Sequence, residues 1–510
     1  MNQTKKAIVI GSGASGLVAS AYLAKSGFDV EILEQAPNIG GYLHTFSLNN
    51  YHFDPGIHYI GECQKNGVVD RIFSEIDIEV ENLFCEMDTD AFDIYRFPDL
   101  EVRRCKGSNA YRDRLAKLFP KETKGIDRFF EHLGLFVQIQ SKMMNPSWAL
   151  SDITLLYQIL SDLPGFYKMK YADYGSFLDY LTSDYRLKAV LSANLGCIGL
   201  PPSRITTLLG LALFNFFNSG AYFPKSGGNG ICDAIKKVSQ SKGAVFRTKS
   251  EVKQILLNDN TAIGVVLKNG EQINADVIIS AIDPTITFGK LIEYQDLPNE
   301  LCQKVIHMKP SLGAFYVFLG LKRDLKNHGM GAFNIWDHYT FDMEEIFKHA
   351  LKGKMSSQLS LVSSFNSLKD TSGSLAPEGC STLEILSFVP YEPFSRWDGL
   401  RSNKRGQEYQ DLKESIGEKM MNTFTKNHPD VVGDIDVKNY ATPVSNSFWV
   451  NAVKGGAYGP AMSISQTMGG RFTPKTCFKN LFLAGSGVFG AGVPACFMSG
   501  MTAARMAENS

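Results

Sequence analysis

The hydrophobic residues of this chain gather in short runs, and three of these runs predict strands of one buried sheet. They lie at Lys6–Ile10, Asp29–Leu33 and Asn480–Gly485. Short apolar runs bounded by glycine or polar residues favour strands that are covered on both faces. Helical spacing follows the first run between positions 17 and 24, and a helix rich in small residues is predicted at 495–506. The pattern therefore predicts an α/β fold with strand–helix units at both ends of the chain.

Four more runs in the middle of the chain predict short strands separated by polar turns such as Asn269-Gly270. The last of these runs is largely apolar and leads back into the first sheet. We therefore expect a β-meander attached to that sheet, and a first domain interrupted by a second one. The four predicted strands are Gly243–Phe246, Val252–Leu257, Ala262–Leu267 and Ala275–Ser280.

Hydrophobic residues also dominate positions 189–224, where Arg204 is the single charge. This stretch forms either core or the wall of an apolar tunnel, and the sequence leaves both open.

Positions 149–162 favour a helix with one apolar face, which packs on the domain or dips into a membrane surface. Ile205–Pro224 and Leu481–Ala504 lack charges and are long enough to cross a bilayer, but their glycines, asparagines or proline argue against lipid-exposed helices.

Composition narrows the classes of protein. A chain of 510 residues is too long for one compact core, so we expect at least two domains. The 52 basic residues balance 52 acidic ones, which argues against nucleic-acid binding. Nine scattered cysteines lack metal-ligand spacing, so no metal site is expected. An apolar strand begins almost at once after Met1, which leaves no room for a signal peptide and predicts a cytoplasmic protein.

A glycine-rich turn joins the first predicted strand to its helix. Gly11 permits a tight turn, Gly13 lets backbone amides approach a pyrophosphate, and Gly16 lets the helix pack closely on the strand. The second predicted strand is followed by Glu34, at the distance where a carboxylate meets ribose hydroxyls. Strand, turn, helix and acid in this register predict a dinucleotide-binding site.

Two further features favour FAD over NAD as the dinucleotide. The pair Gly40-Gly41 follows Glu34 and Pro37 at the spacing typical of flavoproteins. A second glycine-rich turn, at 485–494, presents another helix N-terminus, whose amides can stabilise charge on a reduced flavin. Apart from the glycines at 485–490, which belong to this C-terminal turn, the sequence holds no further G-x-G-x-x-G motif, so we expect no separate NADPH domain, and the electron donor or acceptor stays open.

Five blocks of the chain, listed at the end of this paragraph, together resemble the retinol saturase, carotenoid isomerase and bacterial phytoene desaturase group, and the retinol saturases most of all. Their order agrees from end to end, whereas 76–220 and 286–440 match in outline only. Two departures stand out: Tyr42 replaces a basic residue that phytoene desaturases usually carry, and Gly485-Ser486-Gly487 replaces a common Gly-Gln-Asp. The blocks are Gly40–Phe46, Phe53–Gly61, Ala221–Gly228, Thr442–Ser445 and Lys454–Gly459.

The resemblance implies a Rossmann-type FAD-binding domain with a β-meander, of the glutathione-reductase-like type found in amine oxidases and phytoene desaturases. It also implies a discontinuous α+β substrate domain. The expected FAD-binding domain comprises 1–75, 221–285 and 440–510, and the expected substrate domain comprises 76–220 and 286–439.

The resemblance also implies site residues. His58, Tyr59, Lys454 and Tyr458 are placed near the flavin, where they handle a proton or stack along a polyene. The implied FAD contacts are Gly11, Gly13, Ala14, Ser15, Gly16, Glu34, Gly40, Gly41, Tyr42, Leu43, Val252, Gly485 and Val493.

The implied activity is that of an FAD-dependent oxidoreductase that saturates, desaturates or isomerises double bonds of a retinoid or carotenoid. Because such substrates reside in membranes, the protein is expected to contact a membrane peripherally. Two alternatives remain open. One is a flavin amine oxidase, which shares the N-terminal motif, and the other is a non-enzymatic escort of the GDP-dissociation-inhibitor type, which binds prenylated proteins. The flavin motifs at both ends of the chain argue against the escort.

Overall fold

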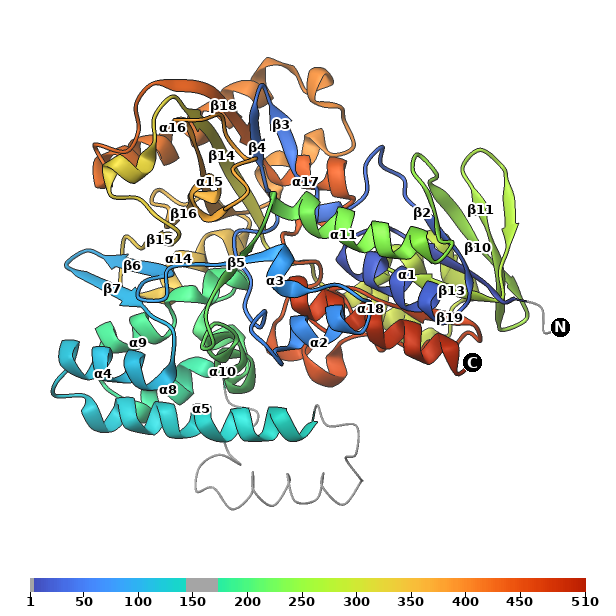
Figure 1. The fold of residues 1–510 in the computed structure, drawn as a ribbon, viewed down its shortest axis with the longest axis horizontal. Coiled ribbons are helices and arrows are strands. Elements are labelled where there is room, and N and C mark those ends of the chain that lie inside the picture. The colour runs from blue at the N-terminus through green and yellow to red at the C-terminus, as the bar shows by residue number, and fades with distance from the viewer. Residues whose placement is uncertain (1–3, 144–172) are drawn as a thin grey trace.

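The computed structural model describes residues 4–143 and 173–510, and the chain forms two parts, each built on its own large sheet (Figure 1). Both termini lie in the part that holds the parallel sheet, at the right of Figure 1. The helix predicted at 149–162 lies outside the described residues. A mixed α/β fold with a parallel sheet is confirmed.

The parallel sheet has five strands in the order β19-β13-β1-β2-β9, and every neighbouring pair runs parallel. The first two predicted strands have the bounds expected from the sequence, and the third is shorter. Chain segments more than 200 residues apart thus lie side by side, because β13 pairs with β1 on one side and with β19 on the other. The strands are β1 (Lys6–Ile10), β2 (Asp29–Leu33), β9 (Val245–Arg247), β13 (Val277–Ser280) and β19 (Leu481–Leu483).

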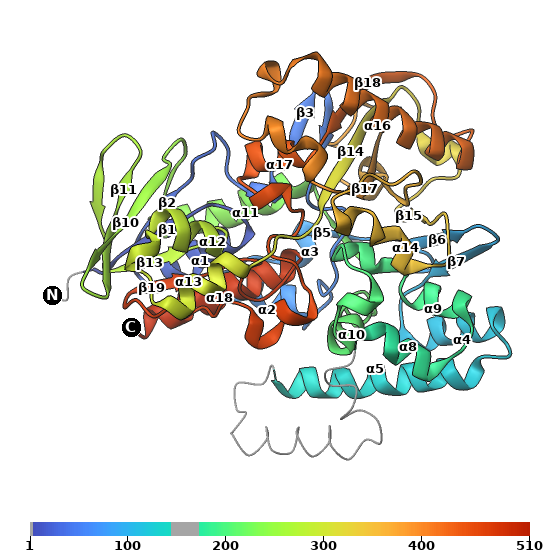
Figure 2. The ribbon, with the colours of Figure 1, turned by 180° about the vertical axis from the view of Figure 1, so that it is seen from behind.

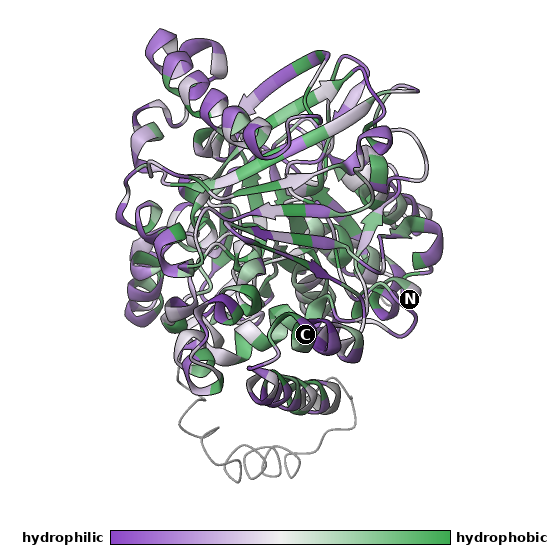
Figure 3. Ribbon diagram, turned by 90° about the vertical axis from the view of Figure 1, so that its left-hand side faces the viewer, coloured by the Kyte–Doolittle hydropathy of each residue, from purple (hydrophilic) through white to green (hydrophobic). Residues whose placement is uncertain are grey.

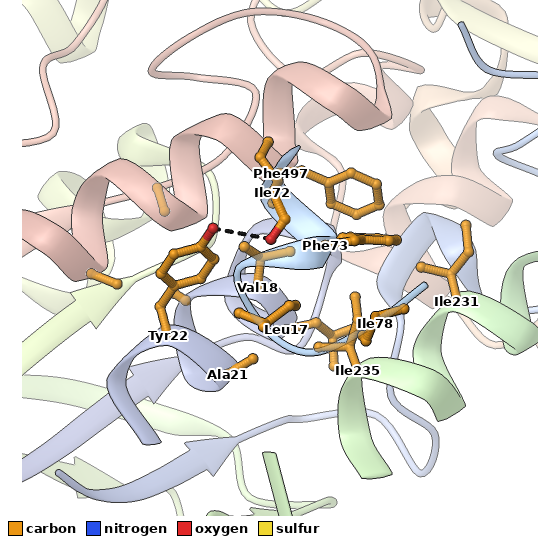
Figure 4. Close-up of a cluster of buried hydrophobic side chains, with 14 of the residues drawn as sticks. Leu17, Val18, Ala21, Tyr22, Ile72, Phe73, Ile78, Ile231, Ile235 and Phe497 are labelled. Atoms are coloured by element: carbon orange, nitrogen blue, oxygen red, sulfur yellow. Dashed lines mark hydrogen bonds between the residues drawn. The ribbon is translucent and has the colours of Figure 1, made fainter. Parts of the chain in front are cut away.

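Four helices pack together on one side of this sheet, and Figure 4 shows their shared core. Leu17 and Val18 meet Phe73 and Phe497 there, and the Tyr22 hydroxyl donates a hydrogen bond to the carbonyl of Ile72 at 3.0 Å. Burying each large apolar side chain stabilises the fold by roughly 1.5–3 kcal/mol. The helices are α1 (Ala14–Lys25), α2 (Val68–Ser74), α11 (Gly227–Ser241) and α18 (Val493–Glu508).

The β-meander is smaller than predicted. It contains three antiparallel strands, β10 (Val252–Asn258), β11 (Thr261–Leu267) and β12 (Gln272–Asn274). The run predicted at 243–246 became β9, which joins the parallel sheet beside β2 instead, because α11 serves as a crossover that returns the chain in the parallel direction. The strand β12 was missed, since Ile273 is its single apolar residue.

The second part is built on a seven-stranded sheet in the order β18-β14-β17-β16-β15-β6-β7. Its strand β14, which lies next to the edge strand β18, is buried at all nine positions, as expected for a strand covered on both faces. All neighbouring pairs are antiparallel except β15 with β6. The strands are β6 (Asp93–Phe97), β7 (Leu100–Arg104), β14 (Gly313–Leu321), β15 (Asn334–Asp337), β16 (Leu361–Ser364), β17 (Ser381–Val389) and β18 (Ile435–Ala441).

Helices cover both faces of the seven-stranded sheet. One core holds side chains of β14 and β17 with those of α16 (Gly406–Asn427), and the other packs the hairpin β3 (Phe46–Leu48) and β4 (Tyr51–Phe53) against β14. Figure 3 shows hydrophilic residues on the outer helices and hydrophobic residues inside. A group of helices lies on one side of this sheet in both Figures 1 and 2. These are α4 (Ser108–Leu118), α5 (Thr123–Met143), α8 (Tyr174–Leu181), α9 (Tyr185–Leu191) and α10 (Thr207–Phe216).

The two uncharged stretches that are long enough to cross a bilayer each fold as separate short elements. Ile205–Pro224 contains α10 and β8 (Tyr222–Pro224), and Leu481–Ala504 contains β19 and most of α18. Among the described residues, no helix has both the length and the apolar character that a membrane span requires.

Candidate active site

The glycine-rich turn between β1 and α1 has the conformation that its sequence predicts. Gly11 has a φ of +91°, which favours glycine, and a side chain at Gly16 would overlap the carbonyl oxygen of Gly11. Gly13 differs from both, because a β-carbon there would meet nothing within 4 Å. Gly13 therefore faces open space, where a ligand can approach the backbone.

Two helices begin at this space. The first is α1, and the second is α18, which enters from the other end of the chain. Neither N-terminus is capped by a side chain, and neither first turn carries an acidic residue. Uncapped amides at a helix N-terminus are suited to an anion such as a pyrophosphate. The Ser15 hydroxyl holds the two helices together by donating to the carbonyl of Cys496 at 2.8 Å.

Glu34 lies at the edge of the same space and is only 9% exposed. One carboxylate oxygen accepts hydrogen bonds from the backbone N–H of Ser12 at 2.9 Å and from its hydroxyl at 2.6 Å, and the other accepts from the N–H of Ala36 at 2.8 Å. A carboxylate accepts about four hydrogen bonds. One acceptor position therefore remains for a ribose hydroxyl.

A cavity of about 1340 Å³ joins these features to the seven-stranded sheet. It runs along the glycine turns and continues past His58 and Tyr59 to α10 and β17. Gly16 is the one predicted FAD contact that does not line it, because this residue serves the packing of α1 on β1. The predicted FAD contacts that line the cavity are Gly11, Gly13, Ala14, Ser15, Glu34, Gly40, Gly41, Tyr42, Leu43, Val252, Gly485 and Val493.

These observations fit a bound FAD. The open space at Gly13 and the two uncapped helices suit its pyrophosphate, and Glu34 suits its adenosine ribose. Tyr42, one of the two departures noted in the sequence, donates its hydroxyl to the carbonyl of Gly456 at 2.8 Å. This contact connects the block Gly40–Phe46 to the block Lys454–Gly459.

Three of the four side chains predicted near the flavin line the cavity. His58 Nε2 lies 3.1 Å from a carboxylate oxygen of Glu384, and the Tyr458 hydroxyl donates to the carbonyl of Gly196 at 3.1 Å. Tyr59 stacks on Phe217 with ring centroids 4.3 Å apart. The fourth, Lys454, is exposed and does not line the cavity, and its backbone has a φ of +48°.

A cluster of buried ionisable groups behind this wall was not expected from the sequence. Glu384 of β17, Lys369 and Asp93 of β6 are all at most 2% exposed. The Lys369 ammonium donates to Asn334 Oδ1 at 2.5 Å and to the carbonyl of His58 at 2.9 Å. One signal was present in the sequence: Glu384 is the only charged residue in an otherwise uncharged run from 381 to 389. We name Asp54, His58, Asp93, Lys369 and Glu384 the buried charge cluster.

Burial shifts the pKa of every member of the buried charge cluster toward its neutral form. It raises the pKa of Asp54 to about 7, that of Glu384 to about 8 and that of Asp93 to about 6. Burial and the nearby Lys369 lower the pKa of His58 to about 3, and burial lowers that of Lys369 to about 7. His58 is therefore a neutral imidazole near pH 7.

α10 resolves the choice between core and tunnel wall by serving as both. Leu209, Ala212, Leu213 and Phe216, at positions i, i+3, i+4 and i+7, line the cavity. The other face packs into the core through residues such as Phe214, which is 2% exposed. Within 189–224, the residues that line the cavity thus include one face of α10, Phe217 just beyond it, and the segment Gly196–Ile198.

The parallel sheet, the two glycine turns and the cavity between them define the class: a flavin-dependent oxidoreductase with a dinucleotide-binding fold. Residues 14–507 match the family described as flavin containing amine oxidoreductase, so the chain belongs to that family. The chain is 28% identical to all-trans-retinol 13,14-reductase of Danio rerio over 97% of its own length and 84% of that protein's. It is 27% identical to prolycopene isomerase 2, chloroplastic, of an Oncidium hybrid cultivar over 98% and 83%.

Solved structures resemble the chain in fold. Cyclohexylamine oxidase from Brevibacterium oxydans IH-35A superposes with a TM-score of 0.61, covering 99% of both chains at 15% sequence identity. Identity this low establishes a common fold alone. The likeness confirms the fold, and the family match confirms that the chain is an oxidoreductase with a flavin cofactor, FAD.

Proposed function

We propose that the protein alters carbon–carbon double bonds of a long isoprenoid, a retinoid or a carotenoid, by saturation, desaturation or cis–trans isomerisation. The observation that carries this proposal is the apolar wall of the cavity beyond the glycine turns. A polyene offers almost no polar groups, so its recognition depends on length, shape and aromatic contacts. The wall includes Ile198, Leu209, Leu213, Phe216, Phe217, Leu386 and Phe388.

The names of the relatives point to the same substrates. A retinol reductase and a prolycopene isomerase act, by their names, on polyenes, and each aligns with nearly all of this chain. The amine oxidase likeness is weaker support for an amine substrate, because at 15% identity it concerns the fold. Belonging to a flavin oxidoreductase family argues against a prenyl-protein escort without redox chemistry.

FAD, when bound, supplies the transfer of a hydride to or from a substrate carbon. The chain's own residues would hold the cofactor, exclude water and handle the accompanying proton. Tyr59 is the best placed for the proton, since this residue lines the cavity and its hydroxyl donates to a buried carboxylate. His58 would act as a neutral hydrogen-bonding group, because the pKa of its imidazole is lowered to about 3. Tyr458 would form an aromatic wall near Phe388, with ring centroids 6.2 Å apart.

Entry from a membrane surface is part of the proposal. Trp449, at the end of α17 (Pro443–Val450), lines the cavity and is also 63% exposed, so α17 borders an opening to the outside. Trp side chains favour the interface between lipid and water. Co-sedimentation with lipid vesicles tests this: Trp449→Ala should bind vesicles less than the parent, whereas equal binding would contradict a role for this opening.

The direct test of function uses the photoreduced enzyme without oxygen. It is incubated separately with all-trans-retinol, with carotenoids and with a primary amine. Saturation is expected to reoxidise the flavin and to give a product heavier by two hydrogens. Unchanged mass with altered chromatographic retention indicates isomerisation, and the oxidised enzyme is tested in parallel for desaturation. Turnover of the amine alone would contradict the proposal.

A further inference from the structure

Asp93 is a buried carboxylate at the start of β6, and nothing in the cofactor site accounts for it. Asp93 is fully buried, yet three of its hydrogen-bond partners, Tyr59, Asn334 and Trp336, line the cavity. The Tyr59 hydroxyl donates to Asp93 Oδ2 at 3.0 Å. Tyr59 is held in this position by its stack on Phe217. The pair thus connects the apolar cavity to a charge that lies behind its wall.

The other partners of Asp93 fix its orientation. Trp336 Nε1 donates to Oδ1 at 2.9 Å, and Asn334 Nδ2 donates to the same oxygen at 3.1 Å. Asn334 in turn accepts from Lys369 through its own side-chain oxygen at 2.5 Å. Oδ1 is therefore fully engaged, whereas Oδ2 faces tyrosine hydroxyls, which both donate and accept hydrogen bonds. A proton on Asp93 would lie on Oδ2, toward Tyr59.

The charge on Asp93 decides whether Tyr59 can release a proton into the cavity. If Asp93 is ionised, loss of the phenolic proton would leave two anions 3.0 Å apart in a buried setting, which is strongly unfavourable. If Asp93 is protonated, its proton moves to the Tyr59 oxygen as the phenolic proton leaves, and no second anion forms.

We propose that Asp93 and Tyr59 form a two-residue proton relay for the reaction at the substrate double bond, with Asp93 as the positioning and proton-storing residue. The inference rests on the proposed function. In saturation, one alkene carbon receives a hydride from reduced FAD and the other receives the Tyr59 proton. Tyr59 recovers a proton from Asp93, which ends as a carboxylate and is later reprotonated from water. In desaturation every transfer runs in reverse, with oxidised FAD as the hydride acceptor.

The groups around Asp93 set its pH dependence. Tyr59 and Tyr95 face Oδ2, Trp336 and Asn334 face Oδ1, and Lys369 lies one hydrogen bond further away. Arg104 lies opposite Asp93 on the neighbouring strand β7. Burial outweighs the hydrogen bonds and raises the pKa of Asp93 to about 6. Saturation is therefore expected to slow as pH rises through about 6, because the protonated carboxyl is the form that supplies the relay.

The test compares single-turnover saturation of all-trans-retinol by the reduced holoenzyme across pH. Asp93→Asn and Tyr59→Phe are each expected to slow saturation by about 100-fold or more and to remove the dependence on pH near 6. The double variant is expected to be no slower than either single variant, since both belong to one relay. A pH dependence that survives in Asp93→Asn, or losses that multiply in the double variant, would overturn the relay.

The matched control is Asp337→Asn, which removes another buried carboxylate of the same sheet. Asp337 accepts from His428 Nε2 at 2.8 Å and does not line the cavity. This variant is expected to keep the parent's rate and pH dependence. If it slowed saturation as much as Asp93→Asn, the effect would belong to the sheet in general and the relay would be wrong.

A second measurement needs no substrate and separates the relay from the proposed function. The carboxyl stretch of protonated Asp93 is followed by infrared spectroscopy against pH, and its band is the one missing in Asp93→Asn. Tyr59→Phe should raise the midpoint, because the lost hydrogen bond favours the ionised form. An unchanged midpoint would overturn the relay. Failure of the parent to convert any polyene would instead refute the proposed function.

Discussion

At one end of the cavity the wall is mostly backbone, and at the other it is mostly side chains. The nucleotide end offers glycine turns and two uncapped helix N-termini, with Glu34 as its main polar side chain. The substrate end offers the apolar face of α10 and, behind it, the buried charge cluster. The difference teaches that backbone conformation decides cofactor binding, whereas the volume and charge of side chains decide which substrate binds and how it reacts.

The sharpest contrast is expected between two glycines of the first turn. Gly16→Val should prevent stable folding, because its side chain would overlap the carbonyl of Gly11 at the contact between α1 and β1. Gly13→Val should fold and lose FAD, since its side chain would occupy only the open space of the cavity. Thermal unfolding and visible absorbance measure both outcomes. Gly134→Ala in α5, where a β-carbon meets nothing within 4 Å, is the control.

The opposite behaviour is expected at the substrate end. Phe216→Asp should abolish turnover of long apolar substrates and keep full FAD content, because an unpaired carboxylate penalises an apolar wall. Phe214→Leu, on the core face of the same helix, should lower stability and leave substrate selection as it is. Steady-state kinetics measures the turnover of each variant, and visible absorbance measures its FAD content. If Phe216→Asp turned over every substrate of the parent, α10 would not form the tunnel wall.

A smaller loss is expected at Glu34, the one side chain on which the nucleotide end depends. Glu34→Ala should weaken FAD binding by roughly 1.5–3 kcal/mol, because the hydrogen bonds of a charged group are lost. Ser12→Ala, which removes a single hydroxyl donor to that carboxylate, should weaken it less. Equilibrium dialysis gives the two dissociation constants, and unaltered affinity in Glu34→Ala would place the ribose elsewhere.

The smallest effect concerns stability against pH. The pKa of Glu384 is raised to about 8 in the fold, so the folded state binds more protons than the unfolded state between about 4.5 and 8. Stability contributed by this group is therefore lost as pH rises through that window. Glu384→Gln, a neutral mimic, should flatten this slope and add about 1–3 kcal/mol at the alkaline end. Urea unfolding at several pH values measures it, and an unchanged slope would contradict the assignment.

The same contrast explains what could be predicted from the sequence. Gly11, Gly13 and Glu34 carry local backbone requirements, which leave a regular spacing in the sequence, and the structure places all three at one cavity. Asp93 and Lys369 come from segments far apart in the chain, and only the folding of the seven-stranded sheet brings them together. Lys454 lies outside the cavity for a related reason, since the packing of the whole fold decides which side chains of a loop reach the cavity.

The position of β19 has a consequence for biosynthesis. This strand pairs with β13, and α18, which follows it, supplies the second helix N-terminus of the cofactor site. A nascent chain therefore exposes an incomplete nucleotide fold until β19 and α18 have left the ribosome, and chains with transiently exposed hydrophobic surface are prone to aggregate. Flavin binding therefore reports that α18 is in place. A chain that stops before α18 is expected to remain colourless, even if the rest of it has folded.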